Sequence, residues 1–266
     1  MGWAGRALGS RERHTREPRQ VRTAMSVLAL GMFVAAFDQT ALGVALPSLV
    51  ADLGNVHDLV WVVGANLLAA TVSAPLWGKF GDIYGRRRVL QADLLTLLVG
   101  CVLAGAAQSM AQLIAFRIVQ GIGSGGLVVL ALATVSDLVP PGERGRRQGS
   151  LNAVFAVGTG LAPLAGGLLT EYSSWRWVFY GTAVLSALAF AGGSLALRIP
   201  APRQERRGFD YLGLGLLAAL STCLMLGVSL GGPPRQAWQV IVFVVLAVLL
   251  GGLFLSHEHR GRFQVQ

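Results

Sequence analysis

The stretch GKFGDIYGRRRVL, residues 78–90, lies between two long apolar runs, residues 59–77 and 89–107. An apolar run of about 20 residues is long enough to cross the hydrocarbon core of a bilayer as a helix. The glycines of the stretch permit a tight turn, and its lysine and arginines hold positive charge between the two runs. The stretch therefore predicts a short basic connection between two membrane helices.

Continuous apolar runs recur along the whole chain of 266 residues. Hydrophobic residues make up 53% of the sequence and charged residues 13%, with a mean hydropathy of +0.58. This composition excludes a soluble domain that covers its own surface with charge. The predicted fold class is all-α integral membrane. The eight predicted transmembrane helices are residues 25–47, 59–77, 89–107, 112–135, 149–169, 177–197, 211–230 and 237–256.

The positive charges gather on one side of these predicted helices. By position, 19 of the 22 lysines and arginines lie in the two tails or in every second connection. Because short loops rich in lysine and arginine stay in the cytoplasm, we expect a multi-pass protein of the plasma or inner membrane with both termini cytoplasmic. The net charge of +9 is thus explained by topology and does not indicate nucleic-acid binding.

The same pattern divides the chain into parts. The predicted parts are an Arg-rich cytoplasmic tail at 1–24, a six-helix bundle at 25–197, a cytoplasmic linker at 198–210, two additional helices at 211–256 and a cytoplasmic tail at 257–266. The linker is the longest charged interior stretch. Membrane lipid is therefore the expected surroundings of most of the chain.

Patterns typical of catalysis are missing from the sequence. The four histidines lie in tails or in a loop, Cys101 and Cys223 each lie inside an apolar run, and no phosphate-binding G-x-x-x-x-G-K-[ST] occurs. The sequence therefore predicts neither an enzyme nor an ATP-driven pump, and no cofactor or metal site.

Four ordered stretches resemble signatures of the major facilitator superfamily. The residues of 78–90 that fall on the fixed positions of its cytoplasmic-loop signature are Gly78, Asp82, Gly85, Arg86 and Arg87. FDQTALGVALPSL, residues 37–49, resembles the first-helix signature of the fourteen-helix drug:proton antiporters, and RIVQGIGSGG, residues 117–126, the fourth-helix motif. GTGLAPLAGG, residues 158–167, resembles the fifth-helix antiporter motif, followed by a matching WRWVF at 175–179.

The resemblance implies a fold and a function. It implies a six-helix N-terminal bundle plus two further helices, as the N-terminal portion of a longer family pattern. It also implies proton-coupled efflux of multidrug or amphiphilic small molecules by alternating access. The chain differs from the family at Ala162, where glycine is usual, and at Asn66, where many drug exporters have tyrosine.

Two charged residues inside predicted helices are the first candidates for coupling. Asp38 lies near the middle of the first helix, where an ionised carboxylate costs at least about 2.5 kcal/mol. It either alternates between a proton and a cationic substrate or pairs structurally with a neighbouring helix. Arg117 belongs by resemblance to the proton-relay motif, and its alternative is a fixed structural pair. Asp93 is the third candidate, with a loop-proximal acid as its alternative.

Two further groups of residues are candidates for gating. The loop residues of 78–87 either latch the cytoplasmic side or form an ordinary basic turn. Gly158, Ala162 and Gly166 recur every four residues on one helix face, and Pro163 removes a backbone hydrogen bond there. With Gly167 they belong to the antiporter motif, which by resemblance shapes an outward gate; the alternative is close helix packing.

A second hypothesis for function belongs to a different class. Six helices line only half of the cavity that such transporters use, so the chain could be a truncated or regulatory half without transport of its own. As a transporter it is expected to need a homodimer or a separate second half as partner.

Overall fold

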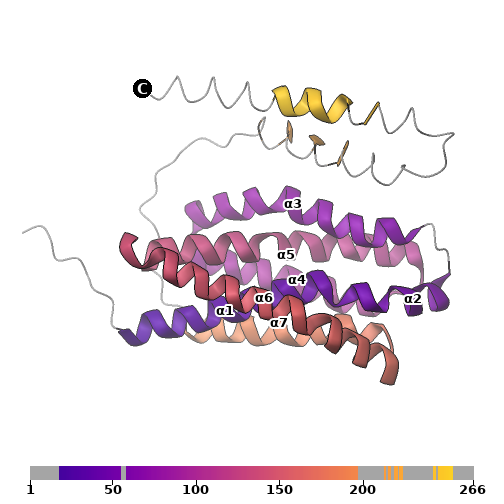
Figure 1. Cartoon of the computed structure of the whole chain (residues 1–266), viewed down its shortest axis with the longest axis horizontal. Coiled ribbons are helices and arrows are strands. Elements are labelled where there is room, and N and C mark those ends of the chain that lie inside the picture. Colours follow the sequence, from indigo (N-terminus) through magenta and orange to yellow (C-terminus); the bar gives the residue numbers. More distant parts are fainter. Residues whose placement is uncertain are drawn as a thin grey trace, which may run out of the picture.

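The computed structural model describes residues 18–54 and 58–196, together with scattered positions within 213–223 and 242–253. All regular structure in these residues is helical, which agrees with the predicted class (Figure 1). The helices are α1 (Pro18–Thr40), α2 (Leu42–Leu53), α3 (Leu59–Tyr84), α4 (Arg86–Gly105), α5 (Met110–Leu138), α6 (Pro141–Tyr172) and α7 (Arg176–Ala196).

Six of these helices are long and apolar enough to cross a membrane, and α2 is a shorter apolar helix that follows α1. They correspond to the first six predicted spans. The seventh and eighth spans, 211–230 and 237–256, lie mostly outside the described residues, and the predicted linker 198–210 and tail 257–266 lie wholly outside them.

The first predicted helix, 25–47, is in fact two helices with a turn at Ala41. Two features of the sequence lie on either side of this turn. The hydroxyl of Thr40 donates to the carbonyl of Ala36 at 2.8 Å and so competes with the backbone ladder. Pro47 has no amide proton and cannot bond the carbonyl four residues earlier, at Gly43. The sequence reading of one continuous helix was therefore wrong at this point.

The predicted loops 78–88 and 136–148 are also mostly helical. Only Gly85, with φ 93°, separates α3 from α4, and only two residues separate the end of α5 from the start of α6 at Pro141. Proline is well suited to the first turn of a helix because its missing amide proton needs no partner there. Likewise α1 begins at Pro18, inside the predicted tail 1–24. Hydropathy marks where a helix leaves the apolar layer, not where it ends.

Helix α5 occupies the middle of the bundle (Figure 1). It packs mainly on α3 and α4, while α6 lies on α1 and α7 lies on α4 and α1. Glycines allow these close approaches: a Cβ on Gly123 would lie 2.1 Å from the backbone nitrogen of Leu97, and one on Gly121 would lie 2.3 Å from the carbonyl oxygen of Asn66. The packing therefore fixes how polar groups on α5 face α3 and α4.

The two ends of the bundle differ in their side chains. We call the end where α3 meets α4 and α5 meets α6 the basic end; it includes Arg86, Arg87 and Arg147. We call the end where α4 meets α5 and α6 meets α7 the opposite end; it includes Asp52 and Arg176.

Candidate functional site

Three polar side chains meet inside the bundle between α1 and α5. The side-chain amide of Gln120 donates to Oδ1 of Asp38, and Nη1 of Arg117 donates to Oε1 of Gln120 at 3.0 Å. None of the three is more than 3% exposed. Arg117 and Gln120 are three residues apart on α5 and so share a helix face. We call Asp38, Gln120 and Arg117 the coupling cluster. The structure thus brings the first two predicted residues together through an amide.

Helix α3 holds the arginine of this cluster from the other side. Nε of Arg117 donates to the carbonyl of Val62 at 3.0 Å, and the side-chain amide of Asn66 donates to the carbonyl of Arg117 at 3.4 Å. Asn66 is buried. These reciprocal bonds hold Arg117 against α3.

The carboxylate of Asp38 has only part of its bonding capacity used. Its Oδ1 accepts from Gln120, while Oδ2 is buried and has no hydrogen-bond partner. The same Gln120 amide also lies 3.3 Å from Sγ of Cys101. A buried carboxylate oxygen without a partner is costly, and a proton or a cationic donor relieves that cost. The cluster can therefore bind a proton at Asp38.

Asp93, the third predicted residue, lies apart from this cluster. It is fully buried on α4, and a Cβ on Gly126 of α5 would lie 2.6 Å from its Oδ1. Neither carboxylate oxygen has a hydrogen-bond partner. The alternative reading of a loop-proximal acid that reaches the interface is wrong, because burial against α5 excludes it.

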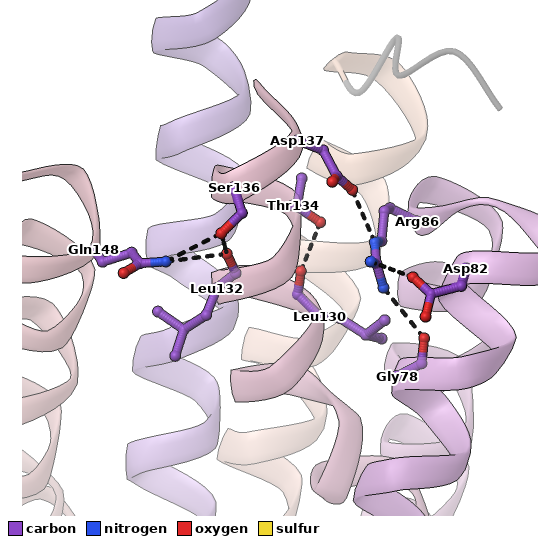
Figure 2. A network of polar contacts seen from close by, with 9 residues as sticks. All are labelled: Gly78, Asp82, Arg86, Leu130, Leu132, Thr134, Ser136, Asp137 and Gln148. Carbon is purple, nitrogen blue, oxygen red and sulfur yellow. Dashed lines mark hydrogen bonds and ion pairs between the residues drawn. The ribbon is translucent and has the colours of Figure 1, made fainter. Parts of the chain in front are cut away.

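At the basic end, Arg86 joins three helices (Figure 2). From the first position of α4 it donates to Asp82 and to the carbonyl of Gly78 on α3, the latter at 3.2 Å. Its Nε donates to Oδ2 of Asp137 on α5 at 3.0 Å. The Arg86 side chain is only 11% exposed, whereas Asp82 and Asp137 are about half-exposed. We call Asp82, Arg86 and Asp137 the basic-end network.

Arg87 does not belong to this network. Its Nη2 donates to the carbonyl of Ser194 on α7 at 2.5 Å, and Gln91 donates to the hydroxyl of the same serine at 3.0 Å. The two neighbouring arginines of the predicted loop therefore tie α4 to different helices.

Sequence reasoning missed Asp137, the network's link to α5. It lies 51 residues after Arg86 and is the only acidic residue in the apolar α5, which is the signal that could have found it. A neighbouring bond also links α5 to α6, since Gln148 donates to the hydroxyl of Ser136 at 3.3 Å (Figure 2).

The predicted antiporter motif lies on the face of α6 that packs against α1 and α2. A Cβ on Gly158 would lie 2.8 Å from Cβ of Ala36, and one on Gly166 would lie 2.5 Å from the carbonyl oxygen of Ala41, at the turn between the two helices. Ala162 is fully buried between them. Gly167 lies at the edge of this face, and α6 continues through Pro163 without ending.

The opposite end carries an ionic contact that sequence reasoning did not single out. Nη1 of Arg176 donates to Oδ2 of Asp52 at 2.6 Å, and the indole of Trp175 donates to the same oxygen at 3.0 Å. Nη2 of Arg176 reaches the carbonyl of Ala107 at 3.1 Å. These hydrogen bonds lower the pKa of the Asp52 carboxyl. We call Asp52, Trp175 and Arg176 the opposite-end clamp.

These features define a multi-pass helical membrane protein with a buried polar cluster between two helices of its bundle. The profile of the Major Facilitator Superfamily matches residues 28–257. The chain therefore belongs to the Major Facilitator Superfamily, a family of transporters and not of enzymes, as the sequence predicted.

Curated relatives share this family and are longer. An uncharacterized MFS-type transporter of Mycobacterium tuberculosis (strain ATCC 25618 / H37Rv) is 40% identical over 243 residues, covering 88% of this chain and 34% of the relative. Multidrug resistance protein 3 of Bacillus subtilis (strain 168) is 36% identical over 246 residues, covering 91% and 47%. The chain thus spans less than half the length of these relatives.

Solved structures show the same fold. An auto inhibited POT family peptide transporter superposes with a TM-score of 0.63 at 18% identity, covering 93% of this chain and 54% of that one. The xylose transporter XylE from E. coli, in an inward open conformation, gives a TM-score of 0.62 at 16% identity, covering 86% and 66%.

Proposed function

We propose that this chain provides the first bundle of a proton-coupled secondary transporter that exports drug-like amphiphilic molecules by alternating access. The observation that carries the proposal is the coupling cluster: Asp38 is buried, one of its oxygens has no partner, and Arg117 is held nearby through Gln120. Relatives named as a multidrug resistance protein and as an efflux pump support the direction and the substrate class.

The cluster suits exchange between a proton and a cation. With Asp38 ionised, its free Oδ2 is a buried acceptor for a cationic substrate. With Asp38 protonated, the carboxyl is neutral and its attraction for that substrate is lost. Because Arg117 is bonded to α3 through Val62, its charge stays near the carboxylate in both states. The two ligands therefore compete for one side chain, which is the requirement for antiport.

The other predicted residues take supporting roles in this proposal. Asp82, Arg86 and Arg87, with Gly78 on α3 and Gly85 between α3 and α4, latch the basic end. We propose that this end lies in the cytoplasm together with both termini. The α6 face formed by Gly158, Ala162 and Gly166, with Pro163 and Gly167, lies on the junction of α1 and α2 and shapes the outward gate.

The complete pathway needs a second bundle. In the proposal this bundle comes from a second copy of the chain or from a separate half, since alternating access rocks one bundle against another around a midplane site. A half that keeps the bundle but does not transport is the competing hypothesis.

The test measures ethidium efflux from energised cells that express the chain, the Asp38→Asn variant or the Glu171→Gln variant, with and without a proton uncoupler. Glu171 is an exposed acid on α6 and serves as the matched control. We expect efflux from the chain and the control, at least tenfold less from Asp38→Asn, and none with the uncoupler.

Three results of the efflux assay would each contradict a part of this proposal. Efflux that survives Asp38→Asn at equal expression would remove Asp38 from coupling. Efflux that survives the uncoupler would reject proton antiport. No efflux above empty cells from a membrane-inserted chain would favour the non-transporting half.

A further inference from the structure

We propose that Asp93 is a second proton-binding site of the bundle, separate from the coupling cluster, whose bound proton holds α4 against α5. The inference concerns packing within the bundle and does not depend on the chain carrying out transport. It starts from a carboxyl group that the folded chain encloses completely.

The enclosure of Asp93 is built by specific neighbours. The residue is 0% exposed, and both of its oxygens are buried without a hydrogen-bond partner. The Gly126 backbone lies close by on α5, although its amide does not meet hydrogen-bond geometry with the carboxyl. A Cβ on Gly126 would lie 2.6 Å from Oδ1 of Asp93 and 2.7 Å from the ring of Trp77. The glycine thus makes the space that the carboxyl fills.

None of the charged groups on the surrounding helices bonds Asp93, and several of them bond other residues. Helix α4 packs against α3, α5 and α7. On these elements Asp82 and Asp137 bond Arg86, Arg117 bonds Gln120 and Val62, and Arg176 bonds Asp52. Other ionisable groups on these helices and on α4 itself are Lys79, Tyr84, Tyr180, Arg87, Arg88 and Cys101.

The charge state of Asp93 follows from this isolation. An ionised carboxylate that is buried this deeply without a paired positive charge is strongly disfavoured. A protonated carboxyl avoids most of the cost of burying that charge. Asp38 differs in this respect, since Gln120 donates to its carboxylate and Arg117 lies next to that amide. The two buried acids are therefore distinct sites.

The bound proton has a consequence for the basic-end network. Arg86 and Asp93 are two turns apart on α4, about 10 Å, and share one face of that helix. Loss of the proton would place a charge between α4 and α5, and separation of the helices or entry of water is the way to solvate it. Such a separation would also strain the contact between Arg86 and Asp137. Ionisation of Asp93 thus loosens this end of the bundle.

The test reads the protonation state directly. Infrared spectra of the purified chain in deuterated buffer at neutral pH would be compared with those of Asp93→Asn and Asp38→Asn. We expect a carbonyl stretch of a protonated carboxylic acid that Asp93→Asn removes and Asp38→Asn leaves in place. A neutral-pH spectrum in which Asp93→Asn changes no such band would overturn the proposal.

A second measurement tests the effect on packing. Thermal unfolding of the wild type, Asp93→Asn and Glu171→Gln would be followed in detergent from pH 6 to pH 9. The unfolded chain releases the proton that the folded bundle holds, so the wild type and Glu171→Gln should lose several degrees of melting temperature as pH rises. Asp93→Asn should lose less. Equal pH slopes for all three chains would contradict the proposal, whatever the efflux assay shows.

Discussion

Asp38 on α1 accepts a hydrogen bond from the side-chain amide of Gln120 on α5, although the two residues are 82 positions apart in the chain. The same amide accepts from Arg117, so one neutral side chain separates the buried acid from the buried base. An amide carries no proton at working pH. Asp38 and Arg117 are therefore joined through Gln120.

Replacement of Gln120 by leucine should destabilise the bundle. The change leaves Oδ1 of Asp38 and Nη1 of Arg117 without the partners they now have. A buried polar group that loses its partner costs roughly 1–3 kcal/mol. Unfolding in detergent should show a loss of that size, whereas Gln39→Leu at the exposed neighbour of Asp38 should change little. Equal losses for both variants would show that the bridge does not stabilise the fold.

Gly123 on α5 and Gly160 on α6 should differ sharply in their tolerance of alanine. A Cβ on Gly123 would lie 2.1 Å from the backbone nitrogen of Leu97, so Gly123→Ala must push α5 away from α4. Overpacking of this kind costs roughly 1–3 kcal/mol. Gly160 on α6 has nothing within 4 Å of an added Cβ, and Gly160→Ala should be neutral or slightly stabilising. The same unfolding assay compares the pair, and a stable Gly123→Ala variant would contradict the close approach.

Arg86→Lys should weaken the basic-end network, because an ammonium cannot present the planar fork that meets Asp82, Asp137 and the Gly78 carbonyl together. Both carboxylates are about half-exposed, so solvent screens the pairs and the loss should be about 1 kcal/mol. A double-mutant cycle with Asp137→Asn measures the coupling. The cycle with exposed Arg88→Lys is the control and should be additive. Additivity in the Arg86 cycle would refute the contact.

The opposite-end clamp should make the stability of the bundle depend on acidic pH. Hydrogen bonds from Arg176 and Trp175 lower the pKa of Asp52 in the folded chain. The clamp therefore contributes its full stability above the ordinary aspartate pKa of about 3.9, and this contribution is lost as pH falls through the lower folded value. Melting temperatures from pH 6 to pH 2 should fall more for the wild type than for Asp52→Asn. Glu171→Gln, which leaves the clamp intact, should follow the wild type.

Much of the architecture was readable from local sequence. Apolar length predicted six of the crossings that the structure describes, and the stretch around Gly85 marked a turn that only a residue with φ 93° completes. The limits of the helices were misjudged because polar residues such as those of 141–148 continue α6 beyond the apolar run. The turn at Ala41 divides the first predicted helix, and hydropathy does not register such a turn.

By itself, the sequence determined that the chain is a helical membrane protein, which of its residues are charged inside apolar runs, and on which side its basic connections gather. Those properties depend on composition and on how apolar and basic stretches alternate along the chain. Only the tertiary structure decided that Gln120 joins Asp38 to Arg117, that Arg86 reaches Asp137, and that Asp93 faces Gly126 without a partner. These pairings depend on how each helix is rotated and how closely glycines let it approach its neighbours, and such long-range geometry is not encoded in local periodicity.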